Sequence, residues 1–160
     1  MTKNKNLDRI LLAVKNLNVE LVIVGRINIK QISFMNAHNL KYKNYEDVSE
    51  SNLVNLYNQS IILLFPSLYE GFGLTILEAQ KMGVSVITSD ISPMKEIVGD
   101  SAILVNPKNI KDIRNKLIRL CKNPLLRKRL VKKGYKNLTR FKPENFRNKY
   151  FLLYKKIAKS

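Results

Sequence analysis

Residues 63–90, LLFPSLYEGFGLTILEAQKMGVSVITSD, decide the fold of this chain. The apolar run at residues 61–65 has the length that a buried parallel strand needs. Gly71 and Gly73 then lie in a loop where the backbone can turn sharply or approach a ligand. After the loop, apolar residues recur at helical spacing until Gly83, and a second short apolar run comes after this glycine. The stretch therefore predicts a strand, a tight loop, a helix and a second strand.

The loop and helix of this stretch have the chemistry of a ligand site. A glycine loop that leads into a helix collects unpaired N–H groups and the positive end of the helix dipole, which favours a phosphate. Glu70 opens the loop, and Glu78 follows eight positions later within the helix. Because the loop folds back, both carboxylates can border one crevice outside the strand ends. The carboxylates can accept hydrogen bonds from hydroxyls, and the N–H groups beside them can donate to phosphates. Together they predict a ligand such as a nucleotide sugar.

These residues resemble the donor-binding half of the family-4 retaining glycosyltransferases (glycosyl transferases group 1), which have the GT-B fold. The shared pattern is Glu, seven residues, Glu, with Gly-Phe-Gly-Leu after the first acid, and the resemblance runs from about residue 5 to 154. It implies an α/β fold with a Rossmann-like parallel sheet and helices on both faces. The chain would be the C-terminal half of a GT-B glycosyltransferase, followed by a helical C-terminus. The positions that carry the pattern are Pro66, Ser67, Glu70, Gly71, Phe72, Gly73, Leu74, Glu78, Ala79, Gly83, Ser89, Asp90, Glu96, Gly99, Asp100 and Pro107.

The resemblance also implies roles for individual residues. Glu78 would accept hydrogen bonds from the ribose hydroxyls. The alternative is that Glu78 has no role in binding and is a solvated acid on the helix. Glu70 would be the catalytic carboxylate at the hexose, where it would accept from ring hydroxyls and favour the positive charge of an oxocarbenium-like transition state. Its alternative is a loop-capping carboxylate. The remaining donor-binding positions around the glycine loop would line the hexose and phosphates or present N–H groups to the diphosphate. They are Gly71, Phe72, Gly73, Leu74 and Thr75.

Two more positions match donor contacts of the family. Lys5 would neutralise the pyrophosphate, and its alternative is an exposed terminal lysine. The backbone of Val48 would meet the nucleobase. The sequence departs from the family pattern at two positions, since Arg26 and Glu46 stand where the family usually has glycine. The family's arginine, five residues before the lysine, falls before the first residue of this sequence.

The resemblance implies transfer of a hexose from a nucleoside diphosphate sugar to an acceptor hydroxyl in polysaccharide or glycolipid synthesis. The donor is a substrate. Neither a cofactor nor a metal is expected, because the resemblance implies a fold that uses no metal and the sequence has no Asp-x-Asp pair. GT-B enzymes close two domains around the donor, so we expect this chain to need a separate N-terminal half for transfer. A non-catalytic nucleotide-sugar-binding module and a sugar-nucleotide epimerase of the same fold remain as alternatives.

Length and composition are those of one domain, residues 1–160. The single cysteine, Cys121, excludes a disulfide within the chain and fits a reducing compartment. The sequence has no apolar run long enough to cross a membrane and no signal-peptide pattern at its start. These features predict a cytoplasmic protein, or one peripheral on the inner face of the membrane.

Positive charge is concentrated in the last third of the chain. Residues 1–107 contain 10 Lys and Arg against 10 Asp and Glu, whereas residues 108–160 contain 19 against 2. Such a segment can bind an anionic membrane surface or nucleic acid, or it can simply be a solvated face. Nucleic acid is the least favoured of the three, because the basic stretch lacks a reading motif and interleaved aromatic residues.

The remaining pattern predicts alternating strands and helices with ligands at the carboxyl ends of the strands. Residues 28–39 are poorly patterned and suggest only a short helix around residues 32–35. Ser49 is placed to cap a helix whose Leu53, Leu56 and Tyr57 face inward. After Pro107 the spacing predicts helices at residues 110–121, 124–134 and 143–157, with proline at the start of the last two.

Overall fold

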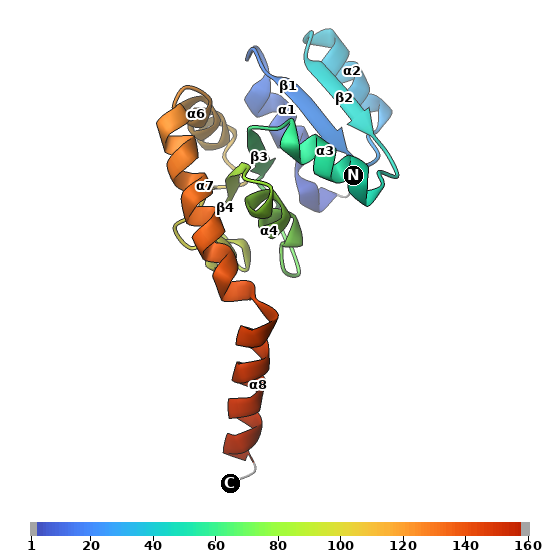
Figure 1. Cartoon of the computed structure of the whole chain (residues 1–160). Helices are drawn as coiled ribbons and strands as arrows, with labels where there is room; N and C mark the ends of the chain where they lie inside the picture. The colour runs from blue at the N-terminus through green and yellow to red at the C-terminus, as the bar shows by residue number, and fades with distance from the viewer. Residues whose placement is uncertain (1–2, 158–160) are drawn as a thin grey trace.

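The structure is a computed structural model that describes residues 3–157, and strands alternate with helices along most of its length (Figure 1). The strands are β1 (Glu20–Val24), β2 (Lys41–Tyr45), β3 (Ile62–Phe65), β4 (Ser85–Ser89) and β5 (Ile103–Val105). The α-helices are α1 (Leu7–Val14), α2 (Ile29–Ala37), α3 (Glu50–Asn58), α4 (Leu74–Lys81), α5 (Met94–Val98), α6 (Ile110–Cys121), α7 (Pro124–Leu138) and α8 (Pro143–Ile157). Two short 3-10 helices, η1 (Lys3–Lys5) and η2 (Thr139–Phe141), complete the list.

Every strand pairing is parallel, which confirms the predicted α/β class. The strands nevertheless form two sheets within residues 3–157, one with the order β1-β2 and one with the order β3-β4-β5. A cleft of about 780 Å³, lined by residues of both β1 and β3, lies between the two sheets. The sheet predicted from the sequence is therefore present in two parts.

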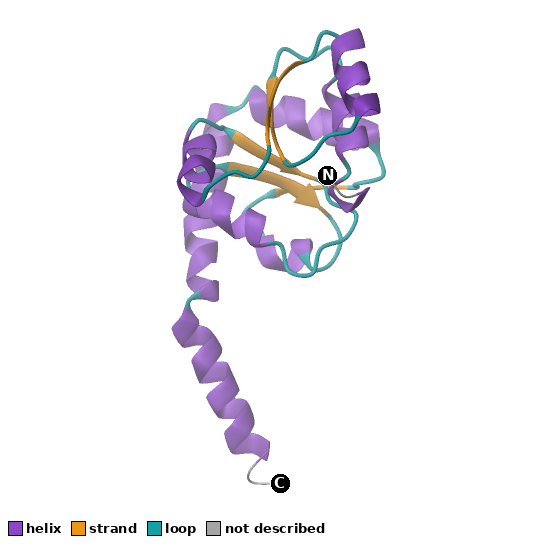
Figure 2. Cartoon of the chain, turned by 90° about the vertical axis from the view of Figure 1, so that its right-hand side faces the viewer, coloured by secondary structure: helices purple, strands orange, loops and turns teal. Residues whose placement is uncertain are grey.

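Helices cover both faces of the three-stranded sheet, as predicted. Alternate strand residues point to opposite faces, so Ile87 of β4 packs into one apolar core and Val86 into the other. The first core joins α1, α2, α6 and the start of α7 to the strands. The second joins α4 and α5 to the opposite face. Figure 2 shows helices on both sides of the strands.

Local capping explains where two of the weaker helices begin. Ser49 accepts a hydrogen bond from the Asn52 N–H and caps α3, as predicted. In α2, Asn28 and Gln31 form a reciprocal capping box, in which each side chain accepts from the other residue's backbone N–H. This box satisfies two N–H groups at the helix start. It lets the poorly patterned segment form a longer helix than the sequence indicated.

The helix predicted to end at Gly134 continues to Leu138, so that boundary was wrong. Gly134 is buried against α4, where a β-carbon at this position would lie 3.1 Å from Cγ of Gln80. The glycine thus allows α7 to approach α4 closely and does not end the helix. A buried glycine that serves packing has the same appearance in a sequence as a helix stop.

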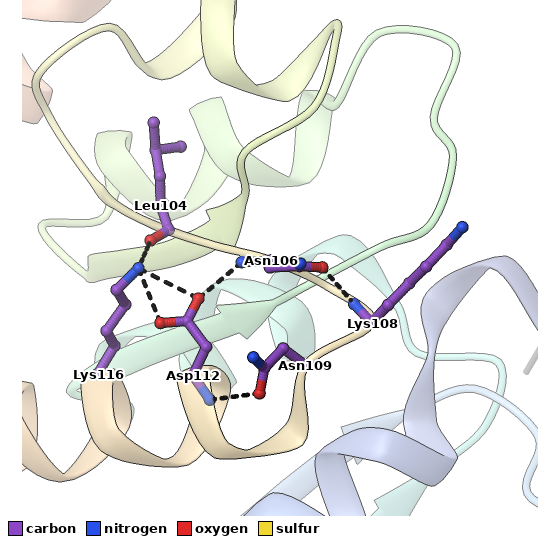
Figure 3. Close-up of polar contacts among 6 residues, drawn as sticks. All are labelled: Leu104, Asn106, Lys108, Asn109, Asp112 and Lys116. Carbon is purple, nitrogen blue, oxygen red and sulfur yellow. Dashed lines mark hydrogen bonds and ion pairs between the residues drawn. The ribbon is translucent and has the colours of Figure 1, made fainter.

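A polar cluster joins β5 to the start of α6 (Figure 3). One oxygen of Asp112 accepts a hydrogen bond from the Asn106 N–H at 2.8 Å, and Lys116 Nζ lies 3.0 Å from the carboxylate. Lys116 also donates to the Leu104 carbonyl, while Asn109 caps the helix by accepting from the Asp112 N–H. Burial opposes the charged form of Asp112, but the Asn106 N–H and Lys116 outweigh it and lower the carboxyl pKa.

The C-terminal helix α8 extends away from the rest of the chain, as both views show (Figures 1 and 2). Its principal contacts are with η2, the turn that precedes it. Several apolar side chains of α8 are exposed, namely Phe151, Tyr154 and Ile157. In the part of the chain that the structure describes, no helix is long and apolar enough to cross a membrane.

Candidate functional site

The predicted site residues gather where β3 ends and α4 begins. The start of the chain is fixed at this edge, because the buried Asn6 side chain donates to the carbonyls of Pro66, just after β3, and Pro107, just after β5. The Leu68 N–H also donates to the Asn4 carbonyl. These bonds bring Lys5 next to the loop that contains Glu70, although the two residues are far apart in the sequence.

Lys5 and Glu70 form an ion pair, with 2.8 Å between Nζ and Oε1. The Lys5 side chain is 31% exposed and that of Glu70 only 14%. The ammonium group also lies 4.7 Å from the centroid of the Phe65 ring. Lys5 is therefore half-buried and ion-paired beside the loop rather than fully exposed.

Glu78 is held by a residue whose role the sequence did not reveal. The Tyr57 hydroxyl of α3 donates to Glu78 Oε2 at 3.1 Å. Burial and the adjacent Glu78 carboxylate raise the pKa of the Tyr57 phenol, so that it remains a hydrogen-bond donor. The helical spacing of Tyr57 indicated that it faces inward, which is correct, but its contact with Glu78 depends on the tertiary fold.

The two glycines of the loop differ in their surroundings, since Gly71 is exposed and Gly73 is buried. A β-carbon at Gly71 would meet no atom within 4 Å, so this part of the loop faces open space. Gly73 is buried and adopts a φ of 100° as it begins α4, a conformation that favours glycine. Leu74, the first residue of α4, is 63% exposed. Its N–H and that of Thr75 belong to the first helical turn, where intrahelical acceptors are lacking.

Phe72 projects from this loop and is 42% exposed. Its ring makes an edge-to-face contact with Phe141 of η2, with 6.1 Å between centroids. Phe72 is thus neither a buried core residue nor free of contacts.

The cleft between the two sheets brings several of these groups together. Lys5, Phe65, Thr75, Glu78 and Tyr57 all line it. Glu70 contacts this group through Lys5. Glu78 thus lines the cleft directly, whereas Glu70 is joined to it only through Lys5.

Val48 does not join this group among the residues that the structure describes. It is half-buried in the loop between β2 and α3 and does not line the cleft. The two departures from the family pattern lie close to that loop and contact each other, with 3.4 Å between Arg26 Nε and Glu46 Oε2. Both side chains are exposed, so this ion pair contributes little to stability.

The polar groups near the site include an unpaired hydroxyl. Ser67 Oγ is buried and has no hydrogen-bond partner within the described part of the chain, whereas the Ser67 carbonyl accepts from the Ser89 hydroxyl. Residues 3–157 contain no cluster of three or more His, Cys, Asp or Glu side chains that could hold a metal ion.

Comparisons with known proteins identify the family of this chain. The sequence model of the family "Glycosyl transferases group 1" matches residues 1–137. The O-antigen chain mannosyltransferase B of Escherichia coli is 31% identical over 106 residues, which are 66% of this chain and 27% of that protein. The chain thus spans about a quarter of the length of this relative.

Solved structures support the same assignment. The C-terminal domain of a glycosyl transferase group 1 family protein (LpcC) from Francisella tularensis matches with a TM-score of 0.72 and 25% identity, over 87% of this chain and 80% of that one. TarM of S. aureus, in a structure with UDP, has the same fold with a TM-score of 0.83 and 23% identity, over 96% of this chain and 33% of that one. The chain belongs to the glycosyl transferases group 1 family and has the fold of the C-terminal domain of a GT-B glycosyltransferase.

Proposed function

We propose that residues 1–160 are the donor-binding domain of a retaining hexosyltransferase. The domain would bind a nucleoside diphosphate sugar, and its hexose would pass to an acceptor hydroxyl in polysaccharide or glycolipid synthesis. The observation that carries this proposal is the arrangement at the end of β3, where the Lys5–Glu70 and Tyr57–Glu78 pairs lie beside an open glycine loop and a helix start. This edge is where ligands bind in parallel α/β folds.

In this proposal Glu78 binds the ribose of the donor. Its carboxylate can accept from both vicinal hydroxyls, and Tyr57 already donates to one oxygen and limits its rotation. An ionised carboxylate has acceptor capacity beyond one bond, so ribose and Tyr57 can bind together. Tyr57 is therefore a positioning residue for Glu78.

Lys5, Glu70 and the loop would bind the sugar diphosphate part. The Lys5 ammonium has three N–H donors, and the Glu70 bond uses one of them, which leaves donors for a phosphate oxygen. The first N–H groups of α4, at Leu74 and Thr75, would contribute to the same anion site. Glu70 would accept from hexose hydroxyls and favour positive charge that develops at the reacting carbon. Gly71, Phe72 and Gly73 would line the hexose.

The base would contact the backbone near Val48. This assignment rests on the resemblance alone, since Val48 does not line the cleft. The acceptor would be recognised mainly by a separate N-terminal half, and retention would follow from acceptor attack on the face from which the diphosphate departs. We therefore expect donor binding without transfer for this chain alone, in a cytoplasmic setting.

The relatives favour a hexose as the transferred group. The E. coli relative is described as a mannosyltransferase of the O-antigen chain, and TarM was solved with UDP. We propose a hexosyl nucleoside diphosphate as the donor of this chain. A non-catalytic nucleotide-sugar module is the second candidate, and transfer activity on addition of an N-terminal half would exclude it.

Titration calorimetry with a panel of nucleoside diphosphates and their hexose conjugates tests the site. We expect one member to bind, and Glu78→Gln to weaken its binding by about tenfold, which corresponds to about 1.4 kcal/mol. Glu50→Gln, at an exposed position on α3, is the matched control and should bind as the unmodified chain does. Absence of binding to the whole panel would refute the assignment.

We propose an anionic membrane surface as a second partner. The charge of residues 108–160, with 19 Lys and Arg against 2 Asp and Glu, supports this. Exposed apolar residues on α8 provide groups that can enter a lipid headgroup region. The chain would then lie peripherally on the inner face of the membrane.

A further inference from the structure

We infer that Phe141 of η2 is a positioning residue for the glycine loop and that it acts through its ring contact with Phe72. This role rests on the donor site proposed above, because residues 70–72 of the loop would line the hexose there. It extends that proposal to a residue outside the motif. The evidence is the way in which the loop is held, the contacts of Phe141 and the bonds that fix η2.

The backbone of the glycine loop has few bonds to the rest of the fold. The Leu68 N–H donates to the Asn4 carbonyl, and the Gly73 carbonyl accepts from the Ile76 N–H. Between these two points, residues 69–72 make no backbone–backbone hydrogen bond within the part of the chain that the structure describes. Segments with so little hydrogen bonding belong to the least stable parts of a fold. The conformation of this loop therefore depends on its side chains.

Side-chain contacts hold the loop on either side of Gly71. Before it, Glu70 forms the ion pair with Lys5. After it, the rings of Phe72 and Phe141 meet with 6.1 Å between their centroids and 88° between their planes. A β-carbon at Gly71 would meet no atom within 4 Å, so packing does not restrict the loop between these contacts. Phe141 thus anchors the loop on the side that leads into α4.

Phe141 can act as an anchor because its own position is fixed. Its ring is half-buried and packs against the second core. The Arg140 guanidinium lies 5.2 Å from the centroid of this ring, within the range of a cation–π contact. Arg140 also donates to the Glu96 carbonyl at 3.0 Å and to the Asn137 side chain at 2.7 Å. These contacts bind η2 to α5 and to the end of α7.

The far end of the loop is held by α5 independently of Phe141. A β-carbon at Gly73 would lie 3.5 Å from Cδ1 of Ile97, so this glycine packs closely on α5. The Ile97 carbonyl accepts from the buried Asn137 side chain at 2.9 Å. The start of α4, which would bind the diphosphate, therefore keeps its place without Phe141. Residues 70–72, which would line the hexose, depend on it.

This division predicts which part of the donor should respond to Phe141. Groups that contact a ligand must be held within about 0.5 Å of their productive geometry. Loss of the ring contact with Phe72 should let residues 70–72 move and should weaken their contacts with the hexose. Contacts of the diphosphate with the start of α4 should remain. A ring pair that only stabilised the fold would not separate the two parts of the donor.

Calorimetry with the full chain measures this difference. The probes are UDP and GDP, each used free and as its hexose conjugate. Phe141→Leu should weaken binding of the conjugate about fivefold, as expected for the loss of one aromatic pair. Binding of the free diphosphate should change by less than about twofold. Phe141→Tyr keeps the ring and should restore the affinity for the conjugate.

Phe34→Leu is the matched control. Phe34 is half-buried as well, and its ring lies 4.2 Å from that of His38. It belongs to α2 and packs against the first core, so its substitution should leave the affinity for every probe unchanged. A similar loss of conjugate binding in Phe34→Leu would mean that the effect of Phe141→Leu is general destabilisation.

A double-mutant cycle tests whether Phe141 acts through Phe72. In a chain that already carries Phe72→Leu, Phe141→Leu should cause no further loss of conjugate affinity, because the ring contact is already absent. Additive losses would show that Phe141 acts by another route. Equal weakening of free diphosphate and conjugate by Phe141→Leu would likewise overturn the positioning role.

Nitrogen-15 relaxation measures the order of the loop without any ligand. In the unmodified chain the amides of Gly71 and Phe72 should have order parameters near those of ordered backbone, about 0.85. In Phe141→Leu they should fall below about 0.6, the range of flexible backbone, whereas Phe34→Leu should not change them. Unchanged order parameters in Phe141→Leu would overturn the inference, whatever the binding results.

The relaxation data also separate this role from the proposed function. If no probe binds the unmodified chain, the donor assignment fails, and the order parameters still decide whether Phe141 holds the loop. If the free diphosphate binds but Phe141→Leu loses no affinity for the conjugate, the donor site stands and the positioning role is refuted.

Discussion

Lys5 raises a question that its position alone does not answer, because it contacts Glu70 while it is proposed to bind phosphate. A purely structural ion pair and a phosphate ligand predict different results for the two partners. Lys5→Met removes the phosphate donor and should weaken nucleoside diphosphate binding by about tenfold. Glu70→Gln frees the ammonium and should leave binding of the diphosphate without sugar unchanged. Calorimetry of both variants measures the difference.

Melting curves provide the control for this comparison. Lys5→Met leaves the mostly buried Glu70 without its cation, so a loss of about 1–3 kcal/mol in unfolding free energy is expected. Binding is therefore compared well below the melting temperature of each variant. Equal weakening by both substitutions would contradict a phosphate role for Lys5 and favour a purely structural pair.

Asp112 should make stability depend on pH. The Asn106 N–H and Lys116 lower the pKa of its carboxyl group in the folded chain, against the effect of burial. A group with a lowered folded pKa stabilises the fold above its unfolded pKa, and this contribution is lost as pH falls through the folded value. Asp112→Asn should therefore cost about 1 kcal/mol in unfolding free energy near pH 7. The difference from the unmodified chain should shrink below about pH 4.

Denaturant titration at several pH values measures this difference. Asp100→Asn is the control, since Asp100 pairs with Lys133 but its side chain is 80% exposed. Solvent screens such a pair, so a smaller effect is expected. An Asp112→Asn cost that stayed constant down to pH 2–3 would mean that the charge of Asp112 does not contribute.

At the scale of elements, Gly134 decides how closely α7 packs on α4. A β-carbon there would lie 3.1 Å from Cγ of Gln80. Gln80 cannot move easily, since its side chain donates to Ser101 and accepts from Asn137 in a buried network. Gly134→Ala gains about 1 kcal/mol in helix propensity but loses about 1–3 kcal/mol through overpacking. We expect a net loss of about 1 kcal/mol by chemical denaturation.

Lys132→Ala, at an exposed position of the same helix, serves as the control and should change stability by less than about 0.5 kcal/mol. If Gly134→Ala were instead stabilising by the full propensity gain, the contact between α4 and α7 would have to be loose. The predicted packing role of Gly134 would then be wrong.

The same elements separate what the sequence could predict from what it could not. Apolar period and capping residues located most strands and helices, because these signals act within one element. The end of α7 was missed, since a buried glycine depends on the neighbouring helix. The division into two sheets was missed because an apolar run indicates burial but not which edges are paired.

The candidate site also contains residues that the sequence could predict and residues that it could not. Glu70, Glu78 and the glycine loop were predicted because they lie within one motif. Lys5 was predicted from the resemblance, and in the structure this residue lies next to Glu70. Tyr57 was recognised only as an inward-facing residue, because its contact with Glu78 joins two helices that are separate in sequence.

At the scale of the whole molecule, the position of α8 makes the membrane proposal testable. The helix extends from the body (Figure 1), and its main contacts are with η2. Removal of residues 143–160 should therefore leave the melting temperature of the body unchanged. These residues include five Lys and Arg and one Glu. With about 1 kcal/mol for each basic residue near an anionic surface, the truncation should weaken binding to phosphatidylglycerol vesicles by at least tenfold.

Vesicle sedimentation at several salt concentrations distinguishes this interaction from its alternatives. Surface charge is screened within about 10 Å at 0.1 M salt, so binding of the full chain should fall as salt increases, and neutral vesicles should not bind. Exposed Phe151 and Tyr154 add an apolar contribution that salt does not screen. Binding that vanishes completely at high salt would indicate charge alone. Salt-sensitive binding to RNA in preference to vesicles, with no effect of the truncation, would mean that α6 and α7 bind a nucleic acid and that α8 has another partner.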